Sequence, residues 1–147
     1  MTLETTMQLS TATANQRAKG YFPELLGLRF TEIERERIVC EMPVRAALLA
    51  PNGFLHAAAV IGIADTACGF GSLASLPEGA ENFATLELKS NFFGTARDGS
   101  LCAVALLMHG GRSTQVWNAD VMHVESDRRI AAFRCTQMIL YPRADAT

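Results

Sequence analysis

Two ionisable side chains interrupt an otherwise apolar stretch of this chain. His56 and Asp65 are the only histidine, acidic or basic residues within residues 55–76, a segment rich in alanine and glycine. Surrounding a carboxylate with apolar groups disfavours its charged form by several kcal/mol. An aspartate in this setting is therefore paired, held neutral, or used as a base or nucleophile in a reaction.

The spacing of these two residues determines how they could share a site. Nine residues along an α-helix correspond to a rotation of about 180° and a rise of about 13.5 Å. His56 and Asp65 of one helix therefore cannot meet at one reacting group. If both take part in the same chemistry, His56 near the helix start of one copy faces Asp65 of a second copy, and we expect at least a dimer.

The predicted helix has two unlike sides. The side of Asp65 carries mostly small residues, namely Ala58, Ile61, Gly62, Cys68, Gly69 and Ser72. The opposite side carries bulkier residues suited to packing on a sheet, namely Val60, Ile63, Ala67, Phe70 and Ala74. Two other interpretations of the segment are a structural helix that holds a hydrogen-bonded aspartate and a membrane span, the latter disfavoured by Asp65 and the glycines.

Composition bounds the class of protein. The chain has 147 residues, a formal net charge of −2 and no basic run longer than Arg128-Arg129. We expect a single domain over residues 1–147 and no nucleic-acid partner. The four cysteines form no Cys-x-x-Cys pair, which favours reduced thiols and no metal. Residues 1–15 lack the pattern of a secretion signal, so the expected location is the cytoplasm.

Periodicity and turn residues predict an α+β protein. A short helix is expected over residues 12–20, with Thr11 or Thr13 as its cap and a turn from Pro23, followed by a hairpin over residues 27–44. A Pro51-Asn52-Gly53 loop precedes the long apolar helix, and strands are expected over residues 82–93, 101–109, 114–125 and 130–141. The expected order is hairpin, long helix and antiparallel meander, with residues 1–10 flexible and residues 143–147 frayed.

Several short segments together resemble one family. The segments Gly53-Phe54-Leu55-His56-Ala57-Ala58, Ala64-Asp65-Thr66-Ala67, Thr85-Leu86-Glu87-Leu88 and Gly111-Arg112 are similar to the signature of hotdog-fold acyl-CoA thioesterases of the phenylacetate-degradation type. The resemblance implies a hotdog fold, in which one long central helix packs on a curved antiparallel sheet. It also implies association through the sheets as a homodimer or a dimer of dimers, a homotetramer. The implied activity is acyl-CoA thioester hydrolysis with no metal and no cofactor, coenzyme A being part of the substrate.

The resemblance also implies roles for individual residues. Asp65 takes the place of the catalytic carboxylate, which activates water or attacks the thioester directly, and Thr85 that of a hydroxyl residue that helps to hold the water. From the facing copy, His56 and the backbone N–H of Ala57 act on the thioester carbonyl at the positive end of the helix. The family has His-Gly-Gly at His56-Ala57-Ala58. The added methyl group disfavours positive φ, so a narrower acyl choice or lower activity is expected.

Further residues are expected to contact the substrate around the helix start, on the side of Asp65, and at turns where a guanidinium can bind phosphate. They are Asn52, Gly53, Ala58, Gly69, Ser72, Arg97 and Arg112. The alternative function is a non-hydrolytic acyl-CoA binding or regulatory hotdog protein. It is motivated by the alanine pair and by Ala50, which stands where some relatives have an asparagine.

Overall fold

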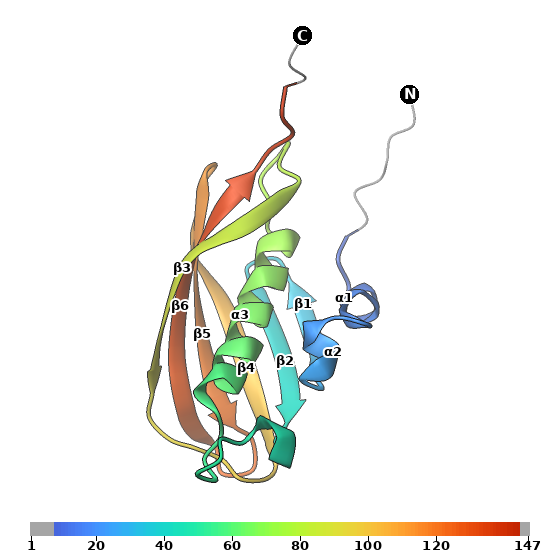
Figure 1. The fold of residues 1–147 in the computed structure, drawn as a ribbon. Coiled ribbons are helices and arrows are strands. Elements are labelled where there is room, and N and C mark those ends of the chain that lie inside the picture. The colour runs from blue at the N-terminus through green and yellow to red at the C-terminus, as the bar shows by residue number, and fades with distance from the viewer. Residues whose placement is uncertain (1–7, 145–147) are drawn as a thin grey trace.

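A strongly curved sheet wraps around one long helix in the computed structural model, which describes residues 8–144 (Figure 1). The sheet contains β1 (Arg29–Glu34), β2 (Arg37–Pro43), β3 (Asn82–Phe92), β4 (Ser100–Gly110), β5 (Thr114–His123) and β6 (Arg128–Leu140). Every pair is antiparallel, in the order β1-β2-β4-β5-β6-β3. Helix α3 (Ala57–Ala74) lies inside the curve. These features confirm the predicted α+β class and the predicted central helix.

Alternation of apolar and polar residues places the sheet on the helix. In β2, Ile38, Cys40 and Met42 are fully buried while the residues between them are half-buried, as the alternation predicted. Helix α3 buries the side formed by Ala59, Val60, Ile63, Ala64, Ala67, Cys68, Gly71 and Ser72. By length and composition α3 could cross a membrane, but more than half of it is buried against the sheet. Helix α3 is therefore the core helix of this domain.

Strand β3 is not where the predicted meander placed it. Strands β4, β5 and β6 do form a meander, but β4 pairs with β2, and β3 pairs with β6 at the far edge of the sheet. The exposure of β3 suits an edge, because Leu86 and Leu88 are 55% and 40% exposed. The outer backbone groups of β3 have no neighbouring strand among residues 8–144. An apolar strand edge of this kind favours pairing with another chain.

The N-terminal segment covers the opposite edge. Helix α1 (Thr11–Ala18) begins at Ser10 and not at the predicted cap, because the Ser10 side chain accepts from the Thr13 N–H and the Thr13 hydroxyl accepts from the Ser10 N–H. The Asn15 amide then both donates to and accepts from the backbone of Phe30 in β1, at 3.1 and 2.8 Å. A side chain therefore takes the place of a neighbouring strand beside β1.

Two further elements connect α1 to the long helix. The segment after Tyr21, predicted as a turn, is the short helix α2 (Phe22–Leu25), because Pro23 is compatible with a first helical turn. The 3-10 helix η1 (Ala46–Leu48) precedes the loop that leads into α3. Of the predicted flexible ends, residues 1–7 and 145–147 lie outside the described residues.

Candidate active site

The start of α3 leaves one backbone donor free. His56 is the N-cap, and its Nδ1 accepts from the Ala58 N–H at 2.9 Å, while its carbonyl accepts from the Ala59 N–H at 2.9 Å. The N–H of Ala57, the residue between His56 and Ala58, has no acceptor among residues 8–144. The first turn of an 18-residue helix carries a partial positive charge. The Ala57 N–H is thus a donor prepared for an external oxygen.

Ala57 and Ala58, which stand where the family has two glycines, do not strain the backbone. Neither Ala57 nor Ala58 has a positive φ, whereas Gly53 in the preceding loop has φ +85° and needs a glycine. The prediction that alanine conflicts with a positive φ is therefore wrong for this helix start. Both methyl groups are exposed beside cavities, so their effect is to occupy space next to the N–H donor.

Replacing His56 tests its capping role. In His56→Ala the Ala58 N–H loses its acceptor, and we expect the free energy of unfolding to fall by about 1 kcal/mol, the usual contribution of an N-cap. Urea denaturation measures this change. His56→Asn, which supplies another good cap, should keep the wild-type stability. His109→Ala is the matched control, since His109 is exposed and should matter by less than about 0.5 kcal/mol.

Asp65 lies in the middle of α3 with an unsatisfied carboxylate. Its Oδ1 is enclosed by protein and has no hydrogen-bond partner, and the side chain forms no ion pair with any residue between 8 and 144. Desolvation by burial raises the pKa of Asp65 above its ordinary value. The interpretation of a structural, hydrogen-bonded aspartate finds no partner here. An unpaired carboxylate with a raised pKa is typical of a reactive group.

Thr85 lies on β3, a strand that contacts α3. Strand β3 runs antiparallel to α3: near one end, the Phe83 ring would be 3.1 Å from a Cβ added at Gly69, and at the other end Phe92 lines a cavity together with Ala57. Asp65 is one turn before Gly69, and Thr85 is two residues beyond Phe83. From this spacing we expect Thr85, which is exposed, to lie nearest the part of α3 that carries Asp65.

A cavity of about 560 Å³ is lined in part by Ala57, the residue that carries the free N–H, and we call it the amide cavity. It is lined by Phe54, Leu55, Ala57, Val60, Phe92, Gly94, Thr95 and Arg128. The Thr95 hydroxyl accepts from the Leu55 N–H at 3.0 Å and so fixes the loop at the mouth of the cavity. Arg128 is its one charged lining residue and forms no ion pair with a residue that the structure describes.

The predicted arginines differ in their positions. The Arg97 guanidinium lies 5.6 Å from the centre of the Phe54 ring, so it reaches a wall of the amide cavity. Arg112 lies over Tyr141, and its carbonyl accepts from the Tyr141 hydroxyl at 2.6 Å. That contact is in the β4–β5 connection, towards the C-terminal end of α3. Within one protomer Arg112 is therefore remote from the Ala57 amide.

The other residues predicted to contact the substrate also differ in whether they lie at the helix start. Asn52 stays at the helix start, where its side chain accepts from the Phe54 N–H, and Ala58 lines a second cavity beside α2. Gly69 is buried under Phe83. Ser72 requires a correction, because it is fully buried, donates to the Cys68 carbonyl at 3.1 Å and lines none of the described cavities.

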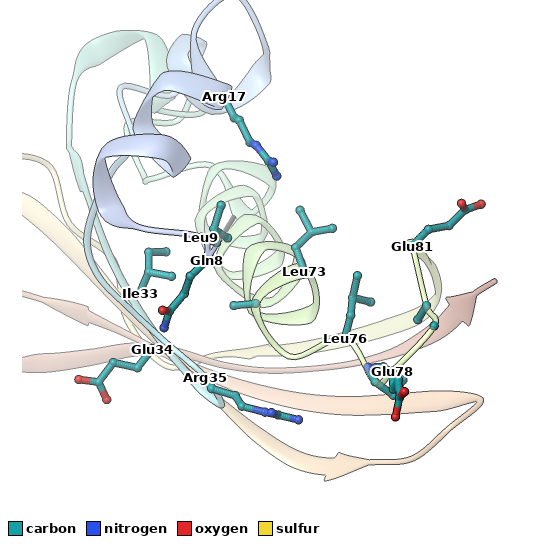
Figure 2. Close-up of a pocket in the computed structure, with 14 residues that line it drawn as sticks. Gln8, Leu9, Arg17, Ile33, Glu34, Arg35, Leu73, Leu76, Glu78 and Glu81 are labelled. Carbon is teal, nitrogen blue, oxygen red and sulfur yellow. The ribbon is translucent and has the colours of Figure 1, made fainter. Parts of the chain in front are cut away.

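The largest described cavity, about 700 Å³, lies at the other end of α3. Figure 2 shows apolar side chains at its centre and charged groups of both signs around it, among them Arg17, Arg35, Glu78 and Glu81. It contains none of the residues predicted for catalysis or substrate binding. The reactive groups are therefore associated with the helix start and with Asp65, and not with this cavity.

The central helix inside a curved antiparallel sheet is the arrangement of the hotdog fold. On that helix, a carboxylate in the middle and a free N–H at the start are the groups expected of a thioester hydrolase. Residues 52–129 match the Thioesterase superfamily, and the chain belongs to that family. It is 31% identical over 117 residues to the putative esterase ComA2 of Bacillus subtilis, covering 80% of this chain and 92% of ComA2. It is 30% identical over 128 residues to the 1,4-dihydroxy-2-naphthoyl-CoA hydrolase of Escherichia coli, covering 86% and 91%.

Solved structures agree on the fold. A variant of the thioesterase PA1618 of Pseudomonas aeruginosa superposes with a TM-score of 0.84 at 26% identity, covering 90% of this chain and 94% of that chain. The PaaI protein of the Escherichia coli phenylacetic acid degradation operon superposes with a TM-score of 0.78 at 21% identity, covering 88% and 91%. The predicted thioesterase family is confirmed by the family match, and the likeness to PaaI confirms the predicted hotdog fold.

Proposed function

We propose that this protein hydrolyses acyl-CoA thioesters at a site shared by two copies of the chain. The observation that carries the proposal is the half-buried carboxylate of Asp65, which has no partner among residues 8–144 and has a raised pKa. The Ala57 N–H of the facing copy supplies the donor for the carbonyl oxygen. The hydrolysis of 1,4-dihydroxy-2-naphthoyl-CoA by a relative, as its name states, supports a coenzyme A thioester as the substrate class.

The geometry of α3 requires the second copy. Eight residues separate Ala57 from Asp65, which is about 12 Å along a helix, too far for both to act on one carbonyl group. The edge strand β3 offers an association surface, because its outer backbone groups face no other strand of residues 8–144 and stand beside exposed Leu86, Leu88 and Phe92. Pairing of two β3 strands about a twofold axis would set the helix start of one copy near Asp65 of the other. The proposed assembly is a homodimer or a dimer of such dimers.

The reaction needs few catalytic groups, since a thioester is already activated. The carboxylate of Asp65 takes a proton from a water molecule held by the Thr85 hydroxyl, and the water oxygen bonds to the acyl carbon. Negative charge gathers on the former carbonyl oxygen, where the Ala57 N–H and the helix dipole stabilise it. The carbon–sulfur bond then breaks as the carbonyl re-forms, and Asp65 returns the proton to the leaving sulfur, so the products are the carboxylic acid and the coenzyme A thiol.

Direct attack by Asp65 is the second possible course of the same reaction. It would form a mixed anhydride that water then hydrolyses. A single turnover in water enriched in oxygen-18 tests for the anhydride. Label in the Asp65 carboxylate indicates an anhydride that water opens at the aspartyl carbon, whereas direct attack of water on the thioester places label in the product acid alone.

A panel of acyl-CoA substrates with thiol detection tests the proposal. We expect release of the coenzyme A thiol by the wild type and its near loss in Asp65→Asn. Binding of intact acyl-CoA in a calorimeter without any thiol release would instead support the non-hydrolytic binding protein. Substantial hydrolysis by Asp65→Asn would remove Asp65 from the reaction.

Arg128 is proposed to bind a phosphate of coenzyme A. Its side chain lines the amide cavity without an ion-pair partner among the described residues, and a guanidinium binds phosphate through paired hydrogen bonds. We expect Arg128→Ala to raise KM for acyl-CoA about tenfold, a loss typical of one charged hydrogen bond, with kcat little changed. Arg129→Ala is the matched control, because Arg129 pairs with Asp120 at 2.8 Å and does not line that cavity. Equal effects of the two substitutions would contradict a specific role for Arg128.

A further inference from the structure

A second cavity touches the start of α3 on the side covered by α2, and we call it the α2 cavity. Its volume is about 370 Å³, and its walls include Phe22, Leu25, Leu26, Leu48, His56 and Ala58. Among residues 8–144, Arg45 is the one formally charged lining residue, and its guanidinium is turned to the Leu25 carbonyl. No carboxylate of this part of the chain lines the cavity. Its chemistry therefore suits an apolar group.

Both cavities are lined by residues of the start of α3. Ala57 lines the amide cavity, whereas its neighbours His56 and Ala58 line the α2 cavity. A thioester whose carbonyl oxygen accepts from the Ala57 N–H has two remaining bonds at the acyl carbon, one to sulfur and one to the acyl chain. These bonds diverge. If the sulfur and its carrier leave towards Arg128, the acyl chain is directed to the α2 cavity.

Packing of α2 against α3 forms the back of this cavity. Gly62 has no side chain, and a Cβ added there would lie 2.9 Å from Leu26 and 3.4 Å from the Phe22 ring. Glycine at this position thus lets α2 approach α3 closely. The outer wall stays uncovered, because Phe22 and Leu25 are 55% and 69% exposed. An apolar ligand would cover part of this exposed area and gain the associated free energy.

We propose that the α2 cavity holds the acyl group of the thioester, and that Phe22 and Leu25 make the enzyme prefer an apolar acyl group of several carbons over acetyl. This inference rests on the proposed function, since it concerns the substrate of the same site. Phe22 and Leu25 are specificity residues here, and they take no part in the bond-making step. The carrier end of the substrate occupies the amide cavity.

The test compares acyl chains in matched variants. The ratio of kcat/KM for octanoyl-CoA to that for acetyl-CoA is measured in the wild type, Phe22→Ala, Leu25→Ala and Tyr21→Ala. We expect this ratio to fall about tenfold in Phe22→Ala, and in the same direction in Leu25→Ala, with little change for acetyl-CoA. Tyr21 is the control, because it adjoins Phe22, is 72% exposed and does not line the cavity. An equal loss in Tyr21→Ala, or an equal loss for both substrates, overturns the inference.

A filling variant and a binding measurement complete the test. Ala47 lines the cavity and is exposed, so Ala47→Phe should reduce its volume and lower the rate with octanoyl-CoA while sparing acetyl-CoA. Octyl-CoA and ethyl-CoA thioethers cannot be hydrolysed, and calorimetry reports their binding without catalysis. Tighter binding of octyl-CoA by the wild type, lost in Phe22→Ala, supports the cavity assignment even if no thioester is hydrolysed. Absence of hydrolysis refutes the proposed function alone, whereas absence of any chain-length effect refutes the inference alone.

Discussion

Asp65→Asn is expected to lower kcat by about 10²-fold to 10⁴-fold, the usual contribution of a positioned general base. The amide has nearly the same shape as the carboxylate but cannot accept the proton of water. Because Asp65 has no partner within the described chain, the substitution breaks no contact there, and KM should change little. Initial rates with a saturating acyl-CoA measure the loss. Thr85→Ala, which removes only the proposed holder of the water, should cost less.

The same substitution should stabilise the fold at neutral pH. Burial raises the pKa of Asp65, so the folded protein holds this proton more tightly than the unfolded chain does. Stability therefore falls as the pH rises from the ordinary aspartate pKa, about 4, through the raised value, and it is level above that. The asparagine avoids the buried charge, so the variant should melt above the wild type at pH 7.5. This advantage should shrink as the pH approaches about 4.

The wild-type rate should follow the same titration. Since a general base acts only when ionised, kcat should rise with pH through the raised pKa of Asp65 and then level off. A variant that melts below the wild type at pH 7.5 would show instead that Asp65 is held by a favourable interaction in the assembled protein.

Ala57→Pro is expected to lower kcat by about 10²-fold to 10³-fold, the usual cost of losing one oxyanion donor. Proline lacks the N–H, but it is favoured at the first position of a helix. The residue before it must be extended, and His56 already has φ −65° and ψ 131°. The fold should therefore persist, which circular dichroism and thermal unfolding check. Ala57→Gly is the matched control, because it keeps the N–H, and it should leave the rate unchanged or raise it.

Combining the two inactive variants tests whether the site is shared. In a dimer made of one Asp65→Asn chain and one Ala57→Pro chain, one site has both defects and the other has an intact carboxylate and an intact N–H. Purified mixed dimers should therefore recover about half of the wild-type activity. If both groups came from the same copy, every site would stay damaged. No recovery in mixed dimers would thus contradict the two-copy site.

Local patterns were sufficient to predict most elements of the fold. The long helix and the strands follow from periodic apolar residues, and the helix start follows from the Pro51-Asn52-Gly53 loop before His56. The strand order could not be obtained this way. Whether β3 pairs with β4 or with β6 depends on how the chain passes around α3, and no short segment encodes that choice.

In the candidate site, too, local patterns identified some residues, whereas the positions of others depend on the tertiary fold. Asp65 stood out because a carboxylate in an apolar helix is costly, and Ala57 because it opens that helix. Ser72 was misplaced, since it shares a side with Asp65 on an ideal helix but lies where the curved sheet has closed over α3. Arg128 could not be singled out from the other arginines near predicted turns, because its approach to Ala57 depends on the β5–β6 connection folding towards the helix start.

The pairing of Asn15 with Phe30 has a consequence for how many copies can join. An open sheet with two free edges could add strands of further chains at both edges without limit and grow into a fibre. Here the amide of Asn15 already occupies the backbone groups of Phe30, so the β1 margin accepts no further strand at that point. Among the strands of residues 8–144, β3 keeps a free outer edge, and a symmetric contact there would use that edge of both partners. We therefore expect growth by strand addition to stop at two chains.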